Sequence, residues 1–209
     1  MSKPFFVLLS VWYHDHAVQF LHAGLVAYSG RGVLFPGKGC TGKSTSALAC
    51  VDNGFRYLGD DFVGLKISEH VLTGYSIFNS ACVEGHHIKN FPALVPFASK
   101  VSLPVEDKST IFLYEVPHCE MLSHVPIRAI AMPKIVDSER SIIKRASPAE
   151  TLLRLAPSTM FFTIPRPDKQ ALDRMAVLVR RVPAYWLEIG RDLNDIAQKV
   201  KDILSHEET

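Results

Sequence analysis

The sequence predicts an α/β fold built on a mixed β-sheet. An apolar segment at residues 32–36 leads into a glycine-rich loop, and residues 43–51, which follow it, are mostly small and suit a helix. A second strand-like segment spans residues 55–59, and the last third of the chain alternates helical patterns with a strand-like one. With 209 residues, of which 47% are hydrophobic, the chain suits a single domain over residues 1–209.

The first segments are short and apolar. Residues 4–9 predict a first strand or helix of the domain, with a secretion signal as the alternative. Residues 18–28 contain a strand in their second half, and the turn at residues 29–32 makes it a hairpin with residues 32–36. His14 and His16 would share one face of a strand, but no further metal ligand is identifiable near them.

The loop after residues 32–36 fits the pattern G-x-x-x-x-G-K-[ST] at every fixed position. Glycines let such a loop curl so that its N–H groups point at phosphate oxygens, and the following helix adds its N-terminal dipole. Lys43 would then reach the β- and γ-phosphates, and the Ser44 hydroxyl would bind Mg²⁺. The alternative is an ordinary glycine-rich turn with a surface lysine. The phosphate-binding residues are Gly37, Lys38, Gly39, Cys40, Thr41, Gly42, Lys43, Ser44 and Thr45.

Two adjacent carboxylates, Asp60 and Asp61, end the strand-like segment at residues 55–59. A parallel strand lying beside residues 32–36 would bring both to the phosphate loop. Carboxylates there can hold Mg²⁺ or accept a proton from an attacking hydroxyl. Side chains of successive strand residues point to opposite faces, so the pair is expected to divide these tasks. A solvated acidic turn is the alternative.

The middle of the chain has weaker sequence patterns than the segments before it. Residues 62–78 predict two strands, broken at residues 68–70 and at Gly74, and strands are also expected at residues 111–116 and 127–132. Residues 79–109 contain three prolines and little periodicity, which is typical of a loop region that faces a substrate.

The last third has clearer boundaries. Residues 147–150 form a capping box with proline at the first helical position, and the helix is expected to stop at Pro157. Residues 168–182 predict a second helix and residues 184–189 a strand. Asp192 is expected to cap a final helix with one apolar face.

Composition excludes several classes of function. The net charge of +2 gives no case for nucleic acid or an acidic membrane surface as a partner, and no apolar run approaches the roughly 18 residues of a membrane span. Its four cysteines lack C-x-x-C spacing, so we expect free thiols in a reducing cytoplasm rather than zinc or disulfides.

The segment from His22 to Val26, the phosphate loop and the segment from Gly54 to Asp61 together resemble the C-terminal catalytic domain of HPr kinase/phosphorylase. That resemblance implies a fold related to phosphoenolpyruvate carboxykinase, ATP with Mg²⁺, transfer of phosphate to a serine hydroxyl, and a homo-oligomer. The family's second motif, E-[IL]-R-G-[LV]-G, is absent, with Glu84 the nearest acidic substitute. Shorter relatives that phosphorylate peptides are therefore a better match than the enzyme that acts on HPr.

The resemblance also implies site roles. It makes one Asp the catalytic base and the other a metal residue, which we assign as Asp60 and Asp61 respectively. His22 is a candidate to act beside the γ-phosphate, with a buried hydrogen-bonded histidine as the alternative. Phosphoryl transfer needs further positive charge, for which Lys134, Arg145 and Arg166 are candidates.

The leading hypothesis is an ATP-dependent kinase that phosphorylates a hydroxyl, a serine of a peptide or protein. Nothing resembles the Asn-Lys-x-Asp motif with which GTPases bind guanine, which favours ATP. Two alternatives are a non-catalytic ATP-binding accessory or regulatory protein and a small-molecule or carboxykinase-like enzyme.

Overall fold

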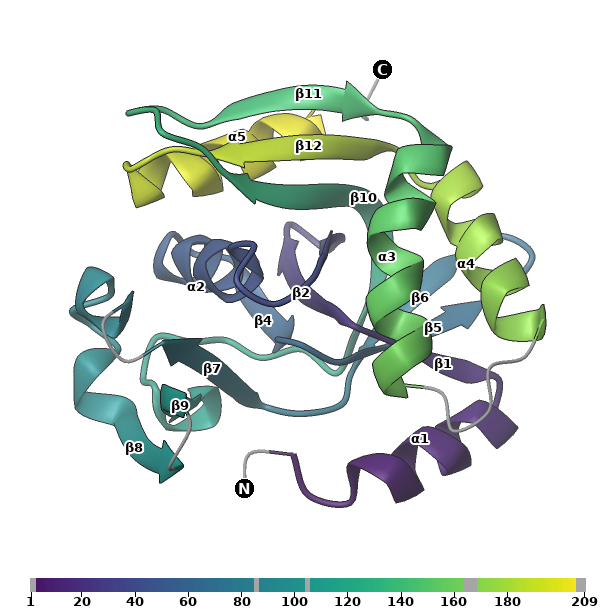
Figure 1. Ribbon diagram of the computed structural model, residues 1–209, viewed down its shortest axis with the longest axis horizontal. Coiled ribbons are helices and arrows are strands. Elements are labelled where there is room, and N and C mark those ends of the chain that lie inside the picture. The colour runs from purple at the N-terminus through teal and green to yellow at the C-terminus, as the bar shows by residue number, and fades with distance from the viewer. Residues whose placement is uncertain (1–2, 85–86, 104–105, 164–168, 206–209) are drawn as a thin grey trace.

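The computed structural model describes residues 3–84, 87–103, 106–163 and 169–205, and it is a mixed α/β structure, as the sequence predicts (Figure 1). The α-helices are α1 (Phe6–Asp15), α2 (Lys43–Asp52), α3 (Pro148–Thr163), α4 (Lys169–Arg181) and α5 (Leu193–Ser205). The strands of the main sheet are β1 (Val18–Leu21), β2 (Ala23–Tyr28), β3 (Arg31–Pro36), β4 (Arg56–Gly59), β5 (Val63–Ile67), β6 (Leu72–Ser76), β10 (His124–Ile135), β11 (Ile142–Ala146) and β12 (Ala184–Ile189). A smaller sheet contains β7 (Ser80–Glu84), β9 (Glu106–Phe112) and β8 (Ala98–Leu103) in that order.

Strand β10 organises the main sheet. The sheet has the order β1-β5-β6-β10-β3-β2-β4, and β12 and β11 continue it from the other end of β10. β10 pairs antiparallel with β6 near its start, then parallel with β3 and β12 further along. A long strand can serve three neighbours because each uses a different part of its length.

The hairpin of β2 and β3 is confirmed. Its two-residue turn has Ser29 at φ 49° and Gly30 at φ 74°, and positive φ at both positions suits the twist of an antiparallel pair. β2 also pairs antiparallel with β4, so β4 is not the direct neighbour of β3 that the sequence analysis expected. Because β2 is antiparallel to both strands, β3 and β4 still run in the same direction and end at the same edge of the sheet.

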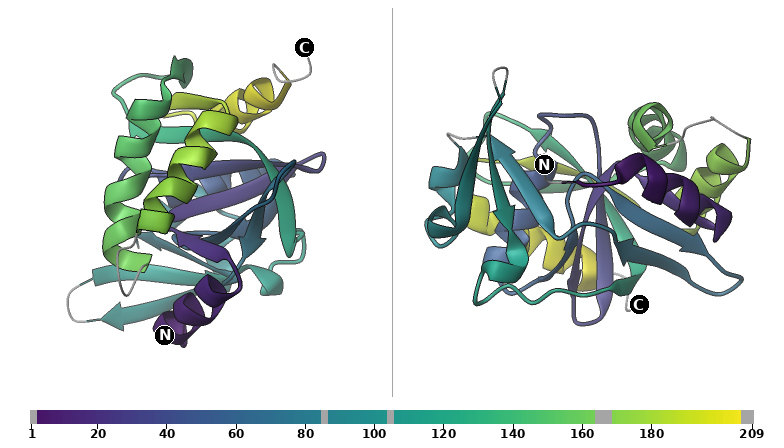
Figure 2. Two further views of the ribbon diagram at one scale, coloured as in Figure 1. Left: turned by 90° about the vertical axis from the view of Figure 1, so that its right-hand side faces the viewer. Right: turned by 90° about the horizontal axis from the view of Figure 1, so that it is seen from below.

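Helices cover the main sheet in two groups. α2 packs against α5 on one face, over an apolar cluster that extends to β7 and β9 of the smaller sheet. α3 packs against α4 on the other face, where the two lie side by side (Figures 1 and 2). The loop between β3 and α2 therefore lies at an edge of the sheet where strands and a helix N-terminus meet.

Three local expectations about the middle of the chain were wrong. The region of residues 79–109 contains β7, β8 and most of β9, so it is a small sheet and not an irregular loop. The strand expected at residues 111–116 ends at Phe112 and passes into a short 3₁₀-helix, Leu113–Glu115, while Gly74 lies inside β6. β8 and β9 form a hairpin, but β7 pairs with β9 across a long sequence separation, which the composition of these strands does not reveal.

The helix boundaries agree better with those predicted from the sequence. Glu150 accepts hydrogen bonds from the backbone N–H and hydroxyl of Ser147, which confirms the capping box, and Asp192 caps α5 through the Asn194 N–H at 3.0 Å. α3 continues through Pro157, where the sequence analysis ended it. Pro157 and Leu153, whose carbonyl loses its helical bond, are both exposed, so water can satisfy that carbonyl.

The first helix, α1, begins at Phe6, inside the apolar segment at residues 4–9, and continues to Asp15. Among the residues that the structure describes, no helix is both long enough and apolar enough to cross a membrane.

Candidate functional site

The loop of residues 37–42 joins β3 to α2 and is tightly curled. Cys40 has φ 58° and Gly42 has φ 97°, both in the left-handed region. A Cβ on Gly42 would lie 2.7 Å from Ile189 Cδ1, and one on Gly37 would lie 2.7 Å from Thr41 Oγ1. An added Cβ would therefore crowd a neighbouring side chain at both positions, and the N-cap of α2 is Gly42, which has no side chain to cap the first-turn N–H groups.

Lys43 begins α2 and is only 4% exposed, which is uncommon for a lysine. Its ammonium donates a hydrogen bond of 2.9 Å to the carbonyl of Lys38, across the loop. Burial lowers the pKa of Lys43, and the nearby carboxylates of Asp61 and Asp60 oppose that shift. A buried ammonium bonded to its own loop is thus available to a ligand that enters the loop.

Asp60 lies at the end of β4 and is 1% exposed. One carboxylate oxygen, Oδ1, accepts a hydrogen bond of 3.1 Å from the Ser44 hydroxyl, and Oδ2 accepts one of 3.2 Å from the backbone N–H of Cys82. Burial and the neighbouring Asp61 raise the pKa of Asp60 to about 6, although Lys3, Lys43 and the Ser44 bond act against them. Asp60 therefore joins the phosphate loop directly to β7.

Asp61 is the centre of a three-residue turn. The Phe62 N–H donates to the Asp60 carbonyl at 2.9 Å, and Asp61 has φ 68°, a combination found in a rare and strained form of γ-turn. This turn sends the Asp61 side chain away from Asp60, toward Lys3 Nζ at 2.5 Å and His22 Nε2 at 3.9 Å. Burial favours a higher pKa, but Lys3, Lys43 and His22 together bring the pKa of Asp61 below its usual range.

His22 lies in the bend between β1 and β2 and is 7% exposed. Its backbone N–H donates to Thr159 Oγ1 of α3, and its ring lies 5.4 Å from the ring of Phe62. Burial and the charge of Lys43 lower the pKa of His22 to about 4, in spite of the favourable charge of Asp61. His22 is therefore neutral at physiological pH.

A cavity of about 350 Å³ lies beside Lys43 and Asp61. It is lined by the loop and the first turn of α2, by Asp61, and by residues 82–84 at the end of β7. Glu84, the acidic substitute noted in the sequence, is among them and accepts a hydrogen bond of 3.3 Å from the Cys40 thiol. The loop motif, Asp61 and Glu84 thus face one space.

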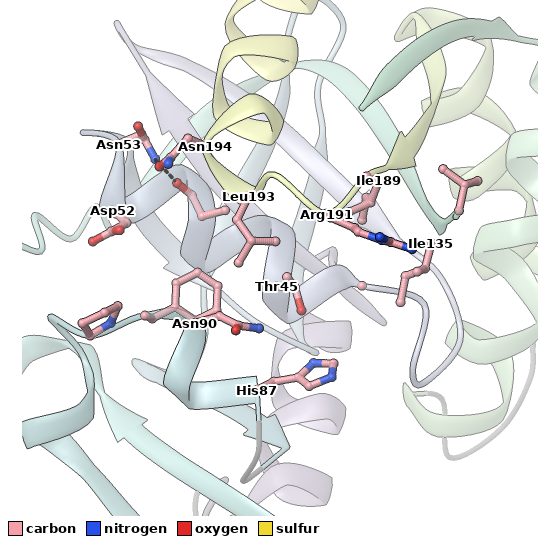
Figure 3. Close-up of a pocket in the computed structure, with 16 residues that line it drawn as sticks. Thr45, Asp52, Asn53, His87, Asn90, Ile135, Ile189, Arg191, Leu193 and Asn194 are labelled. Carbon is pink, nitrogen blue, oxygen red and sulfur yellow. Dashed lines mark hydrogen bonds between the residues drawn. The ribbon is translucent and has the colours of Figure 1, made fainter. Parts of the chain in front are cut away.

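A second cavity, of about 610 Å³, adjoins the first and shares Gly42, Thr45, His87 and Ile135 with it. Figure 3 shows Thr45 of α2, Leu193 at the start of α5 and Asn90 converging on this space. Phe91 adds an aromatic surface, while Asp52, Asn53 and Asn194 supply polar groups at the α2–α5 end.

Several other candidates are not brought into this arrangement. Lys134 and Lys144 pair with Glu188 on β12, and Arg145 donates to the Tyr185 hydroxyl at 2.6 Å. Arg166 lies outside the described residues. His14 and His16 lie on or next to the end of α1 and not on a strand. Within the described ranges no group of three or more His, Cys, Asp or Glu side chains could hold a metal by itself, and none of the four cysteines, all of which lie in those ranges, forms a disulfide.

Two basic residues at the site were not predicted from the sequence. Lys3 contacts Asp61, and its ammonium lies 4.9 Å from the ring centroid of Phe62. Arg154 of α3 approaches Gly37, with its Nε 3.4 Å from where a Cβ would be, and this buried Nε has no hydrogen-bond partner among the described residues. Neither belongs to a motif, so only the fold could identify them.

Comparison with known proteins gives one curated match. Over 85 residues, or 39% of this chain, the sequence is 36% identical to HPr kinase/phosphorylase of Clostridium acetobutylicum. The chain covers 28% of that protein's length. No family model matches the sequence. The curated match confirms, over its own extent, the resemblance that the motifs indicate.

Among solved structures, the Hpr(Ser) kinase/phosphatase from Coxiella burnetii aligns with 91% of this chain and 90% of its own, with a TM-score of 0.49 and 14% sequence identity.

Proposed function

We propose that this protein is an ATP-dependent kinase that transfers the γ-phosphate to a hydroxyl, a serine of a peptide or protein. The observation that carries the proposal is that the two adjacent aspartates have different neighbours. Asp60 bonds to Ser44 in the first turn of α2, whereas Asp61 turns toward His22 and lines the smaller cavity. The similarity to a kinase/phosphorylase over 85 residues supports the same class of chemistry.

The two adjoining cavities support a nucleotide as the phosphate donor. Phosphates would bind the N–H groups of the loop and the ammonium of Lys43 in the smaller cavity. The nucleoside would extend past Thr45 into the larger cavity, where Leu193 offers apolar surface and the side chains of Asn53 and Asn194 offer polar groups. ATP remains the proposed nucleotide because the guanine motif is absent from the sequence.

The donor set near Ser44 fits Mg²⁺. A hydroxyl and a carboxylate oxygen lie 3.1 Å apart at Ser44 and Asp60, and Mg²⁺ is commonly held by one or two such oxygens together with substrate phosphates. When bound, the ion would neutralise charge on the phosphate oxygens. Asp60 is thus the proposed metal residue.

Asp61 is the proposed base. The acceptor hydroxyl would give its proton to an Asp61 carboxylate oxygen while its own oxygen bonds to the γ-phosphorus, and the bond from that phosphorus to the β–γ bridging oxygen would break to release ADP. Its lowered pKa keeps Asp61 ionised and able to accept the proton. In this proposal the aspartates exchange the roles that the sequence analysis gave them, because Ser44 bonds to the first of the pair.

His22 is proposed to support the base and not to transfer a proton itself. Its low pKa leaves it neutral, and its Nε2 lies 3.9 Å from Asp61 Oδ1. A neutral imidazole beside the carboxylate limits the space in which the acceptor can approach.

The absence of disulfides among the four cysteines is consistent with the proposed cytoplasmic location.

The test is incubation of the purified protein with γ-labelled ATP and Mg²⁺, with serine-containing peptides encoded near its own gene and with small hydroxyl compounds, followed by intact mass measurement. We expect a gain of one phosphate on a peptide serine, lost in Asp61→Asn. Transfer only to a small compound would replace the peptide kinase by a small-molecule kinase. Binding of ATP without transfer to any acceptor would refute the kinase and favour a nucleotide-dependent regulatory protein.

A further inference from the structure

The segment before α1 reaches the proposed base from outside the nucleotide motif. Lys3 Nζ lies 2.5 Å from Asp61 Oδ2, and its side chain is only 17% exposed. The same ammonium lies 4.9 Å from the centroid of the Phe62 ring, so two consecutive residues of the γ-turn contact it. A lysine this enclosed is held in place and is not a freely solvated surface group.

Aromatic packing explains how Lys3 is held there. Phe6, the first residue of α1, has its ring 4.4 Å from that of Phe62, 5.9 Å from that of Phe20 and 6.4 Å from that of Phe78. These contacts join the start of α1 to the residue that follows Asp61. The short connection from Phe6 back to Lys3 therefore delivers the ammonium to one side of the carboxylate.

Asp61 needs such support because its backbone is strained and its side chain meets few groups. The charged or titratable groups that act on it come from separate elements: Lys3 before α1, His22 after β1, Lys43 of α2 and Asp60 of β4. Of these, Lys3 makes the direct contact with Oδ2, whereas His22 faces Oδ1. The two oxygens of the carboxylate thus have different surroundings.

We propose that Lys3 is a positioning residue for phosphoryl transfer, which holds Asp61 through Oδ2 and thereby presents Oδ1 to the acceptor hydroxyl. This role rests on the proposed kinase function. Fixing one oxygen restricts rotation of the carboxylate, and misplacement of a reacting group by about 1 Å can cost roughly 100-fold in rate. Lys3 acts through Asp61, so its removal should affect turnover and leave nucleotide binding intact.

The test compares Lys3→Met, Lys3→Arg and, as a matched control, Lys144→Met, which removes a lysine that is paired with Glu188. For each protein, kcat with a peptide acceptor, KM for ATP and the Kd of Mg·ADP would be measured. We expect Lys3→Met to lower kcat about 10- to 100-fold with KM and Kd changed less than about twofold, Lys3→Arg to recover most of the loss, and Lys144→Met to behave as wild type.

Each other outcome overturns the role of Lys3. If Lys3→Met has the kcat of the wild type, Lys3 has no positioning role. A higher kcat would make Lys3 an inhibitory contact, and a parallel loss of nucleotide affinity would make it a phosphate ligand. If the wild-type protein transfers phosphate to no acceptor, the proposed function fails and the role of Lys3 fails with it. Failure of Lys3 alone is recognised because the wild type then still transfers.

A second variant tests how Lys3 is delivered. Phe6→Ala removes the ring that packs on Phe62, and Trp12→Ala removes an aromatic side chain of the same helix that is 54% exposed. We expect Phe6→Ala to reproduce the kcat loss of Lys3→Met with nucleotide Kd unchanged, and Trp12→Ala to have no such effect. Equal activity of Phe6→Ala and wild type would show that the aromatic packing does not deliver Lys3.

Discussion

The two sides of the candidate site are built in different ways. The phosphate side is one continuous piece of chain, the loop of residues 37–42 and the first turn of α2. The carboxylate side is assembled from the segment before α1, the bend after β1 and the turn after β4. In the continuous part residue order alone dictates which groups meet. In the assembled part neighbours are set by strand order and aromatic packing, and a change in either would move Asp61 and the side chains around it.

The largest expected effects separate Asp60 from Asp61. Asp61→Asn removes the proposed base, so kcat should fall about 10²- to 10⁴-fold while affinity for Mg·ATP changes little. Asp60→Asn removes the proposed metal residue, so the Mg²⁺ concentration needed for half-maximal activity should rise, and excess Mg²⁺ should restore part of the rate. Titration of Mg²⁺ at saturating ATP for both variants makes the comparison.

Recovery of Asp61→Asn by added Mg²⁺, with Asp60→Asn unresponsive, would reverse the two roles. It would return the aspartates to the assignment made from the sequence, in which the first is the base. The Ser44–Asp60 hydrogen bond would then be structural.

His22 gives the carboxylate side a pH dependence that the loop lacks. Its pKa is lowered from 6.5 to about 4 in the folded protein, so the unfolded chain binds more protons in this range and stability falls as pH drops from 6.5 to 4. The full shift corresponds to about 3 kcal/mol. Urea denaturation of wild type and His22→Gln between pH 4 and 7 should show the wild type losing up to that amount relative to the variant. Parallel curves would mean that His22 titrates normally.

Lys43→Ala tests the phosphate side. Removing the ammonium deletes a charge-assisted bond to phosphate, which is worth about 1.5–3 kcal/mol, so nucleotide Kd should rise about 10- to 100-fold. Lys144→Ala is the matched control, because Lys144 pairs with Glu188 on β12 and is not among the predicted phosphate-binding residues. Titration of Mg·ADP by calorimetry measures both. Equal losses would indicate general electrostatic attraction and no specific role for Lys43.

The structure of the phosphate side was predicted well because it depends on residues that are close together in the sequence. The loop, the start of α2 and the β2–β3 hairpin follow from glycine, a helix-compatible stretch and a turn with positive φ. The Asp pair was expected near the loop, and it is there, although the expected neighbour of β3 was wrong. The insertion of β2 between β3 and β4 preserves the direction of β4, and direction alone decides at which edge the aspartates lie.

The assembled side could not be predicted in the same way. Lys3 and Arg154 are isolated basic residues in sequence, and their positions depend on the packing of Phe6 and of α3. The small sheet that supplies Cys82 and Glu84 to the site forms by pairing across long separations. The order of roles proposed for the Asp pair rests on a γ-turn, which directs Asp61 toward Lys3, and a turn of this kind is not visible in the sequence.

The smallest expected effect concerns two glycines with positive φ. Gly30, in the hairpin turn, has φ 74° and open space around its Cα, so Gly30→Ala should cost about 1–2 kcal/mol from backbone conformation alone. Gly42 has φ 97°, and an added Cβ would lie 2.7 Å from Ile189 Cδ1, which is buried. Since the end of an isoleucine can shift, Gly42→Ala should cost only about 1 kcal/mol more than Gly30→Ala. Thermal unfolding and Mg·ADP binding of both variants measure the difference. Nucleotide affinity should fall in Gly42→Ala alone, and an equal fall in both would show that the loop conformation does not govern binding.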